Sequence, residues 1–297
     1  MSLRTPAYER GRRRWRERAL AALATVTLMY AVIAAALWWG QERLLFRPAP
    51  LPTDFKFKLG ADVHESWLDV PGARLNVLHL KLPQPGGMVF FLHGNGGNLS
   101  SWFVNVDWYR RQNLDLYMID YRGYGKSSGR IESEAQLHAD VRAAWDHVAP
   151  AYAGKRRIVY GRSLGTALAA KLAADVQPDM TVLVSPFSGM LDLAHEQFPL
   201  LPRPLLAAVL RYPLQTAEAV AQLRGPLWLA HGERDTLIPP VHSERLLAIA
   251  PADTGATLLR LPLAAHGDVH QFSDYLDGLA AALRSTGSTA STASTAR

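Results

Sequence analysis

The chain of 297 residues contains no cysteine. This absence excludes disulfides, thiolate zinc sites, iron–sulfur clusters and a cysteine nucleophile. A chain without thiols is compatible with either side of a membrane, so cysteine usage leaves the redox compartment open.

The net positive charge of the chain is concentrated at the N-terminus. The first 18 residues hold seven Arg and two Glu, which account for about +5 of the formal net charge of +6. The rest of the chain is therefore nearly neutral. A basic groove for nucleic acid is not expected, and neither is a nucleic-acid partner.

Two phosphate-binding patterns are incomplete. Gly125-Lys126-Ser127 resembles the end of a P-loop, but Asp120 stands where that motif requires its first glycine. The glycines of residues 94–97 do not complete a dinucleotide pattern, because position 99 is Leu99. We therefore expect no nucleotide or nicotinamide cofactor. Instead, Asp120 and Arg122 are predicted to form local hydrogen bonds that brace the floor of a site.

What the chain does have is an uncharged apolar run at residues 19–40. As a helix with a rise of about 1.5 Å per residue, this run is long enough to cross a hydrocarbon core of about 30 Å. Trp38 and Trp39 lie at its end, where amphipathic rings favour the membrane interface. A secretory signal has a shorter apolar region of about 7–15 residues. We predict an uncleaved transmembrane signal anchor, although the small residues 34–36 keep cleavage open.

The arginine-rich segment precedes this span. By the positive-inside rule, residues 1–18 form a basic cytoplasmic N-terminus, and everything after the span lies on the opposite side of the membrane. That side is the periplasm if the membrane is a bacterial inner membrane. Residues 41–52 contain prolines and are predicted to form a tether.

Residues 53–283 are predicted to form one domain, followed by a disordered Ser/Thr/Ala tail at 284–297. Within the domain, apolar strand patterns alternate with helical ones. This alternation predicts an α/β fold, a mostly parallel sheet with helices on both faces and an edge hairpin turning at Pro71-Gly72. A Pro- and Leu-rich stretch at about 187–223 is predicted to form a small helical flap over the carboxyl edge of the sheet. Strands are predicted at 64–70, 73–80, 88–92, 114–119, 157–160, 181–184, 226–230 and 257–261, and helices at 135–149 and 167–174.

Polar residues collect where the predicted strands end, which is where sites form in parallel sheets. Ser163 sits in a Gly-x-Ser-x-Gly turn between a strand and a helix. The glycine loop, which we define as residues 93–98, follows another strand. Asp235 follows a third strand, and His266 lies just past the last one.

A serine hydroxyl needs a base, and the base needs an acid to hold its tautomer. The order Ser, Asp, His predicts Ser163 as nucleophile, His266 as general base and then acid, and Asp235 as the carboxylate that orients His266. The backbone N–H groups of Leu164 and Asn95 are predicted to form the oxyanion hole.

Other residues compete for the role of base. His270 is the alternative, because element boundaries are uncertain by a few residues and because Ala264-Ala265 precede His266 instead of the commoner Gly-x. His93 is interpreted as a structural residue that bonds its neighbouring loop.

For the acid, Glu233 and Asp192 are the alternatives to Asp235. The spacing His266-x-Asp268-x-His270 could suggest a metal site, but no third converging ligand is evident, so no metal is expected.

Several motifs together resemble the α/β-hydrolase superfamily. Within it, the chain is similar to the single-pass, membrane-anchored α/β-hydrolase-domain proteins, a group that includes protein depalmitoylases. The resemblance covers about residues 41–283 and implies hydrolysis of an ester, thioester or amide through an acyl-enzyme. The motifs are Gly161-Arg162-Ser163-Leu164-Gly165, the glycine loop, residues 120–129, residues 231–239 and the entry at 41–48.

These observations predict a membrane-anchored serine hydrolase that cleaves a small-molecule or lipid-linked acyl ester or thioester. A serine peptidase with the same triad is one alternative, and a non-catalytic, membrane-anchored scaffold of hydrolase fold is another. The sequence leaves open the acyl-chain length, the leaving group and the oligomeric state.

Overall fold

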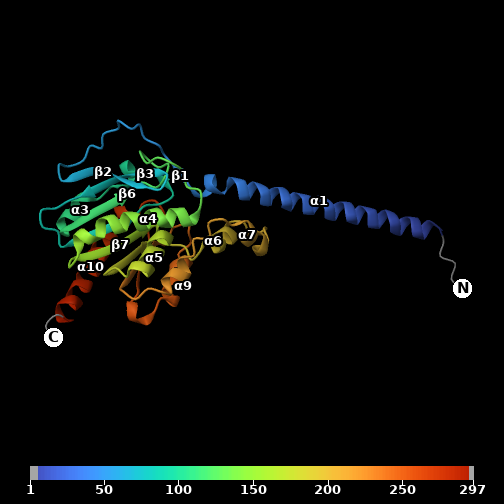
Figure 1. The fold of residues 1–297 in the computed structure, drawn as a ribbon. Coiled ribbons are helices and arrows are strands. Elements are labelled where there is room, and N and C mark those ends of the chain that lie inside the picture. Colours follow the sequence, from blue (N-terminus) through green and yellow to red (C-terminus); the bar gives the residue numbers. More distant parts are fainter. Residues whose placement is uncertain (1–5, 294–297) are drawn as a thin grey trace.

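The computed structural model describes residues 6–293, and the side chains of residues 10–285. Its centre is an eight-stranded sheet with the order β10-β9-β8-β7-β4-β6-β3-β2 (Figure 1). Strands β4, β6, β7, β8, β9 and β10 are parallel, whereas β2 and β3 form an antiparallel hairpin at one edge. The predicted α/β class, mostly parallel sheet and edge hairpin are confirmed. The strands are β2 Val63–Val70, β3 Ala73–Leu80, β4 Gly87–Leu92, β6 Leu114–Ile119, β7 Arg156–Arg162, β8 Met180–Val184, β9 Leu227–Gly232 and β10 Thr257–Leu261.

Helices cover both faces of the sheet, and each face has its own apolar core. In β4, Phe90 faces one core and Phe91 the other, because successive side chains of a strand point to opposite faces. Burial on both sides explains why this strand is a continuous apolar run. One face carries α4 Glu134–Val148, α5 Leu164–Val176, α8 Thr216–Val220 and α9 Val241–Ile249, and the other carries α2 Leu99–Trp102, α3 Val106–Arg111 and α10 Ser273–Ala293. Short 3₁₀ helices lie at Ala149–Tyr152, Ala252–Thr254 and Val269–Gln271.

Helix α1, Pro6–Leu45, extends away from the domain as one continuous helix (Figure 1). The predicted span lies within it. Among the described residues, Arg10–Leu45 is the one helix long and apolar enough to cross a membrane, with a mean hydropathy of 2.2 in its 18-residue window. The helix also takes in residues 41–45 of the predicted tether. That part of the tether prediction is corrected, because these residues favour helix and Pro48 is the first proline to interrupt it.

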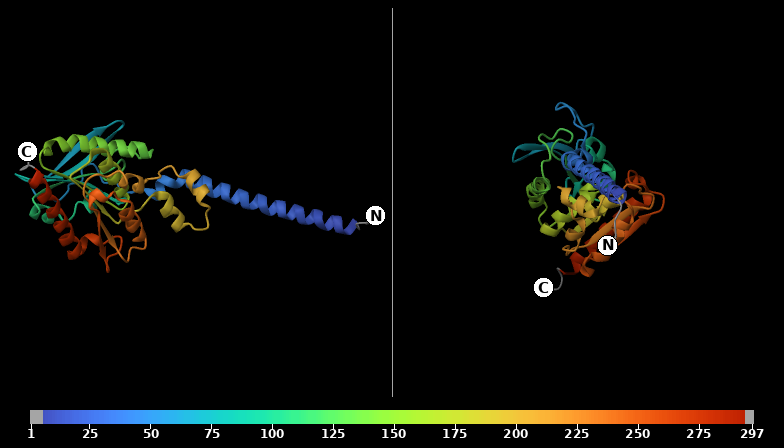
Figure 2. Two further views of the ribbon diagram at one scale, coloured as in Figure 1. Left: turned by 90° about the horizontal axis from the view of Figure 1, so that it is seen from below. Right: turned by 90° about the vertical axis from the view of Figure 1, so that its right-hand side faces the viewer.

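The flap, residues 187–223, contains α6 Met190–Gln197 and α7 Arg203–Val209, and continues into α8. Two perpendicular views show α6 and α7 projecting from the body beside the domain-proximal part of α1 (Figures 1 and 2). The predicted helical flap is therefore present, and it leans on α1.

The C-terminal helix differs from the sequence prediction. Helix α10 continues to Ala293, where a disordered tail was predicted from residue 284. The helix is already nucleated by packed residues such as Tyr275 and Leu279, and each further residue that joins it adds one backbone hydrogen bond. Residues 294–297 of the predicted tail and residues 1–5 of the predicted N-terminal segment lie outside the described residues.

Candidate active site

Ser163 occupies a sharp turn between β7 and α5. Its φ of 52° and ψ of −122° are a conformation that residues other than glycine seldom adopt. The turn presses the backbone against its neighbours: a Cβ on Gly165 would lie 2.1 Å from the carbonyl oxygen of Leu92, and one on Gly161 would lie 2.4 Å from that of Gly165. The predicted sharp turn and its need for both glycines are confirmed.

The structure brings together three residues that are distant in sequence. His266 Nε2 lies 2.9 Å from Ser163 Oγ, and His266 Nδ1 lies 2.7 Å from Asp235 Oδ2. The Asp235 side chain is fully buried, whereas that of His266 is 23% exposed. We call these three residues the candidate triad.

The surroundings of Asp235 keep its carboxyl group ionised. Burial acts to raise the pKa of Asp235, but hydrogen bonds from His231 and His266 outweigh it and hold that pKa well below its usual range. The N–H groups of Leu237 and Ile238 also donate to Oδ1, at 3.0 Å and 2.8 Å. An ionised carboxylate only accepts hydrogen bonds, so Nδ1 of His266 must carry the proton and Nε2 is left to accept one from Ser163.

The two residues predicted to form the oxyanion hole, Leu164 and Asn95, line the same cavity as Ser163. Leu164 is the first residue of α5, so its N–H has no carbonyl one turn earlier within the helix. Asn95 belongs to the glycine loop. The carbonyl oxygen of Asn95 accepts hydrogen bonds from Tyr124 Oη at 2.7 Å and from the N–H of Arg47 at 2.8 Å. These bonds fix the orientation of the loop.

The segment just after α1 pairs with the glycine loop and holds it in place. Strand β1, Arg47–Pro48, lies parallel to β5, Gly96–Gly97, and the two form a separate two-stranded sheet. The N–H of Ala49 also donates to the carbonyl of Gly97 at 3.2 Å. The predicted tether is therefore a structural part of the candidate site.

The alternative bases have other partners. His270 Nδ1 accepts a hydrogen bond from the Arg162 guanidinium at 2.9 Å. His93 is fully buried, and its Nδ1 donates to the carbonyl of Gly94 at 2.7 Å, in agreement with the predicted structural role. The geometry therefore places only His266 of these three histidines against Ser163.

The alternative acids are also engaged elsewhere. Glu233 forms an ion pair with Arg260 at 3.2 Å, and Asp192 forms one with Arg203 at 2.6 Å. Neither bonds His266, which is bound to Asp235 instead.

Arg162, the residue before the serine, is a site residue that the sequence did not indicate. Its guanidinium is buried and donates to the carbonyl oxygens of His266 at 3.1 Å and Gly267 at 3.0 Å. It also lies over the ring of Trp102, 5.3 Å from the centroid. Arg162 thus holds the loop that carries His266. The only sequence signal was a charged residue next to a predicted buried strand.

An apolar cavity of about 360 Å³ begins at Ser163. Fifteen of its twenty lining residues are apolar, and they come from α1, the flap, the loop after β9 and, in the case of Leu164, the start of α5. Leu37, Gln41, Leu44 and Leu45 of α1 are spaced by four, three and one residues, which places them on one face of the helix. The sequence had assigned these residues to the span and tether, so this cavity wall was missed.

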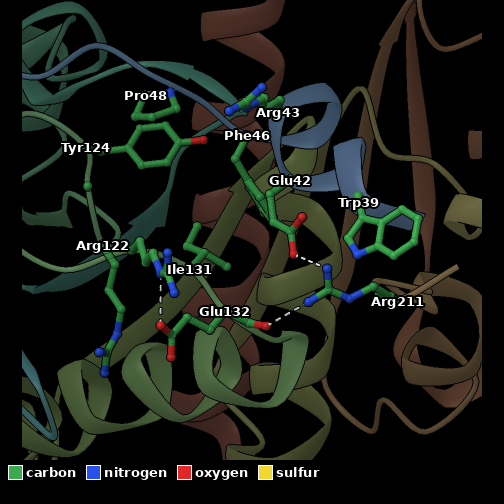
Figure 3. A pocket seen from close by; sticks show the side chains of 12 residues that line it. Trp39, Glu42, Arg43, Phe46, Pro48, Arg122, Tyr124, Ile131, Glu132 and Arg211 are labelled. Atoms are coloured by element: carbon green, nitrogen blue, oxygen red, sulfur yellow. Dashed lines mark hydrogen bonds and ion pairs between the residues drawn. The ribbon is translucent and has the colours of Figure 1, made fainter. Parts of the chain in front are cut away.

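Gln41 fastens α1 to the flap. Its side chain is buried, donates to the carbonyl of Val209 at 3.0 Å and accepts from the N–H groups of Arg211 at 2.8 Å and Tyr212 at 3.1 Å. Next to it, Glu42 forms an ion pair with Arg211 at 2.5 Å, as the close view shows (Figure 3). The end of α1 is thereby fixed to the domain through satisfied buried polar groups.

A second cavity, of about 660 Å³, lies along the other face of α1. From that helix it is lined by Trp39, Glu42 and Arg43, and it also includes Phe46 (Figure 3). Ser163 is not among its lining residues. The chemistry of the candidate triad therefore belongs to the apolar cavity.

The side chains of the possible metal-binding pattern, His266-x-Asp268-x-His270, bind other groups of the protein. Asp268 Oδ1 accepts the N–H of Ala265 at 2.7 Å, while His266 and His270 bind the groups described above. Among the residues that the structure describes, no group of three or more His, Cys, Asp or Glu is arranged to hold a metal ion.

Comparisons with known proteins give the context of this geometry. A family model described as "Serine aminopeptidase, S33" matches residues 83–216. The chain is 30% identical over 254 residues to "Alpha/beta hydrolase domain-containing protein WAV2" of Arabidopsis thaliana, covering 77% of this chain and 82% of that protein. It is also 33% identical over 241 residues to an uncharacterized protein of Mycobacterium tuberculosis, covering 78% and 83%.

Solved structures share the fold at lower identity. An esterase from Pyrococcus furiosus superimposes with a TM-score of 0.62 at 18% identity, covering 81% of this chain and 97% of the esterase. An α/β hydrolase from Vibrio vulnificus gives a TM-score of 0.62 at 19% identity, covering 77% and 89%. These likenesses concern the fold.

Proposed function

The chain belongs to the α/β-hydrolase superfamily, and from that premise we propose that it is a membrane-anchored serine hydrolase that cleaves acyl esters or thioesters. One observation carries the proposal: His266 bridges Ser163 and Asp235 by two hydrogen bonds at the inner end of an apolar cavity. In this proposal residues 19–40 of α1 span the membrane, residues 1–18 are cytoplasmic, and the domain of residues 53–283 acts on the opposite side.

The first half of the reaction forms an acyl-enzyme. Ser163 Oγ attacks the acyl carbonyl while His266 Nε2 takes its proton, and the negative charge of Asp235 stabilises the resulting imidazolium. The oxyanion of the tetrahedral intermediate accepts hydrogen bonds from the N–H groups of Leu164 and Asn95. His266 then returns the proton to the alcohol or thiol leaving group as the bond to that group breaks.

The second half releases the acid. Water attacks the acyl-enzyme, His266 again takes the proton, and a second tetrahedral intermediate collapses to the carboxylic acid and free Ser163. The hydrogen bonds from His266 to Ser163 and Asp235 support these roles, because they require no large rearrangement of the candidate triad.

The cavity favours an acyl group over a peptide substrate. An aminopeptidase binds the ammonium group of its substrate, and a carboxylate is the usual partner for such a charge. The described residues that line the apolar cavity include no Asp or Glu, and the one charged residue is Arg47. A hydrocarbon chain fits this lining, whereas an ammonium group does not.

Activity-based labelling tests the proposal. The full-length chain in detergent is treated with a fluorophosphonate and assayed on p-nitrophenyl esters of increasing length and on amino-acid p-nitroanilides. We expect labelling at Ser163, ester cleavage, and loss of both in Ser163→Ala. A folded protein that resists labelling would favour the scaffold alternative, and preferential cleavage of the anilides would favour the peptidase.

A further inference from the structure

The tip of the flap is exposed and apolar. The side chain of Leu200, in the turn between α6 and α7, is 88% exposed, and that of Phe198 is 47% exposed. Between residues 198 and 210 the one ionisable side chain is Arg203, which is paired with Asp192 at 2.6 Å. Such a surface is costly in water and well suited to hydrocarbon.

The contact between the flap and α1 fixes the depth of this tip. Tyr30 Oη donates to the carbonyl of Leu200 at 3.4 Å, and Tyr30 precedes Gly40, the end of the predicted span, by ten residues. Ten residues of helix measure about 15 Å, which is about half of a 30 Å hydrocarbon core. When residues 19–40 cross the membrane, Leu200 therefore lies below the membrane surface.

Backbone groups at the tip of the flap have hydrogen-bond partners within the protein, as a location in hydrocarbon requires. Backbone polar groups within a bilayer need partners inside the protein. In the exposed turn between α6 and α7, the N–H of Phe198 donates to the carbonyl of Ala194 at 2.8 Å, and the N–H of Leu201 donates to the carbonyl of Phe198 at 3.0 Å. The carbonyl of Leu200 accepts a hydrogen bond from Tyr30. The perpendicular views show both flap helices following the direction of α1 away from the sheet (Figure 2).

The apolar cavity connects this region to Ser163. Its lining includes Leu37, which lies within the predicted span, and Phe198 at the base of the flap tip. At its other end are Ser163 and Asn95. A chain that leaves the hydrocarbon layer between α1 and α7 meets apolar side chains along the way to the nucleophile.

We infer that the flap inserts into the leaflet on the domain side of the membrane and opens the apolar cavity directly to its hydrocarbon. The substrate class is then an acyl lipid or lipidated molecule resident in that leaflet, whose chain reaches Ser163 without crossing water. This assignment of substrate rests on the proposed hydrolase function, whereas the insertion of the flap does not.

The absence of cysteine makes the insertion measurable at single sites. Leu200→Cys and, as a control, Ile249→Cys at the end of α9 each receive an environment-sensitive fluorophore in the full-length chain, reconstituted in phosphatidylcholine vesicles. Ile249 is also exposed, at 43%, but it belongs to a helix outside the flap. Nitroxide groups on the lipid chains should quench most of the emission at position 200 and little at position 249, while aqueous iodide should do the reverse. Equal iodide quenching at both positions would overturn the insertion.

A second measurement tests access of the substrate. Leu200→Glu should lower hydrolysis of a long-chain ester in vesicles by about tenfold or more, because a charge is expelled from hydrocarbon. It should leave cleavage of a soluble short-chain ester unchanged, since Leu200 does not line the cavity. Ile249→Glu is the control and should affect neither substrate. Equal rates of vesicle hydrolysis in Leu200→Glu and wild type would contradict access through the flap.

The two proposals can fail separately. A wild-type protein that cleaves neither ester would refute the hydrolase function, and the quenching measurement would still decide whether the flap is inserted.

Discussion

The candidate triad and the apolar cavity are built in opposite ways. Ser163, Asp235 and His266 lie on the loops that follow strands β7, β9 and β10, and hydrogen bonds connect their side chains. The cavity is walled by helices that leave the sheet, and some of its residues are exposed, such as Leu44 at 52% and Phe198 at 47%. The candidate triad is therefore positioned by strands, whereas one wall of the apolar cavity is positioned by α1.

This difference separates two properties of the protein. The ends of the strands position the reacting groups of the candidate triad, so substitutions there should alter the rate of the proposed chemical step. In the proposed function, the helices determine which acyl chain fits the cavity and from which side it enters, so substitutions in them should alter specificity. The predictions below test this separation, from the largest expected effect to the smallest.

Removal of the proposed nucleophile, Ser163, should abolish turnover and leave substrate binding intact. We expect Ser163→Ala to lower kcat by about 10⁵-fold to 10⁶-fold, because the triad acts as a unit. Its affinity for a non-hydrolysable long-chain analogue should match that of wild type, since the fifteen apolar lining residues remain. Kinetics and calorimetry measure the two quantities. A parallel loss of affinity would show that the regions are not separable.

Weakening the support of His266 should lower kcat with little change in KM. Lysine cannot reproduce the several hydrogen bonds of the Arg162 guanidinium, so the His266 loop loses its position in Arg162→Lys. A misplacement of about 1 Å costs on the order of 100-fold in rate. Arg157→Lys, on the same strand, is the matched control and should behave as wild type. A change confined to KM would contradict a positioning role for Arg162.

Filling the cavity from α1 should change chain-length preference alone. Leu37→Trp is expected to lower kcat/KM for long-chain esters by about tenfold and to spare short ones, because the added ring occupies the outer part of the cavity. Val32→Trp, on the same helix outside the cavity lining, serves as the control. A uniform loss over all chain lengths would place Leu37 in the chemical step instead.

The smallest effect concerns His270 and pH. Burial, and secondarily the charge of Arg162, lower the pKa of His270 in the folded protein. Between that lowered pKa and the unfolded value near 6.5, the unfolded chain binds more protons, so stability falls as the pH falls. In His270→Asn the free energy of unfolding should fall less steeply between pH 7 and pH 5, by under about 1.4 kcal/mol per pH unit. Denaturant unfolding at several pH values measures this, and identical slopes in both proteins would refute it.

The sequence predicted the sheet and the residues of the candidate triad for a physical reason. The carboxyl ends of parallel strands meet at one edge whatever the distance along the chain, so Ser163 and His266 could be brought together without knowledge of their contacts. The turn at Ser163 was predictable from Gly161 and Gly165, because its strain is local.

The rest of the site depends on contacts that no local pattern records. Arg162 bonds carbonyl groups more than 100 residues away, and backbone groups accept almost any partner. The cavity wall formed by α1 depends on how this helix packs against the flap. An apolar residue such as Leu37 suits a membrane span and a cavity wall equally well, so its hydrophobicity could not distinguish the two, and Leu44 was assigned to the tether.

The hydrogen bonds of Gln41 join two segments of the chain that are synthesised at different times. Gln41 bonds Val209, 168 residues later, and α1 is synthesised before any of its partners. Chains emerge from the ribosome at about 5–20 residues per second, so several seconds pass between the synthesis of α1 and that of the flap. In that interval the amide of Gln41 is without its partners, and the cavity lacks the walls formed by the flap and by the loop after β9. The flap therefore packs against a helix that is already formed.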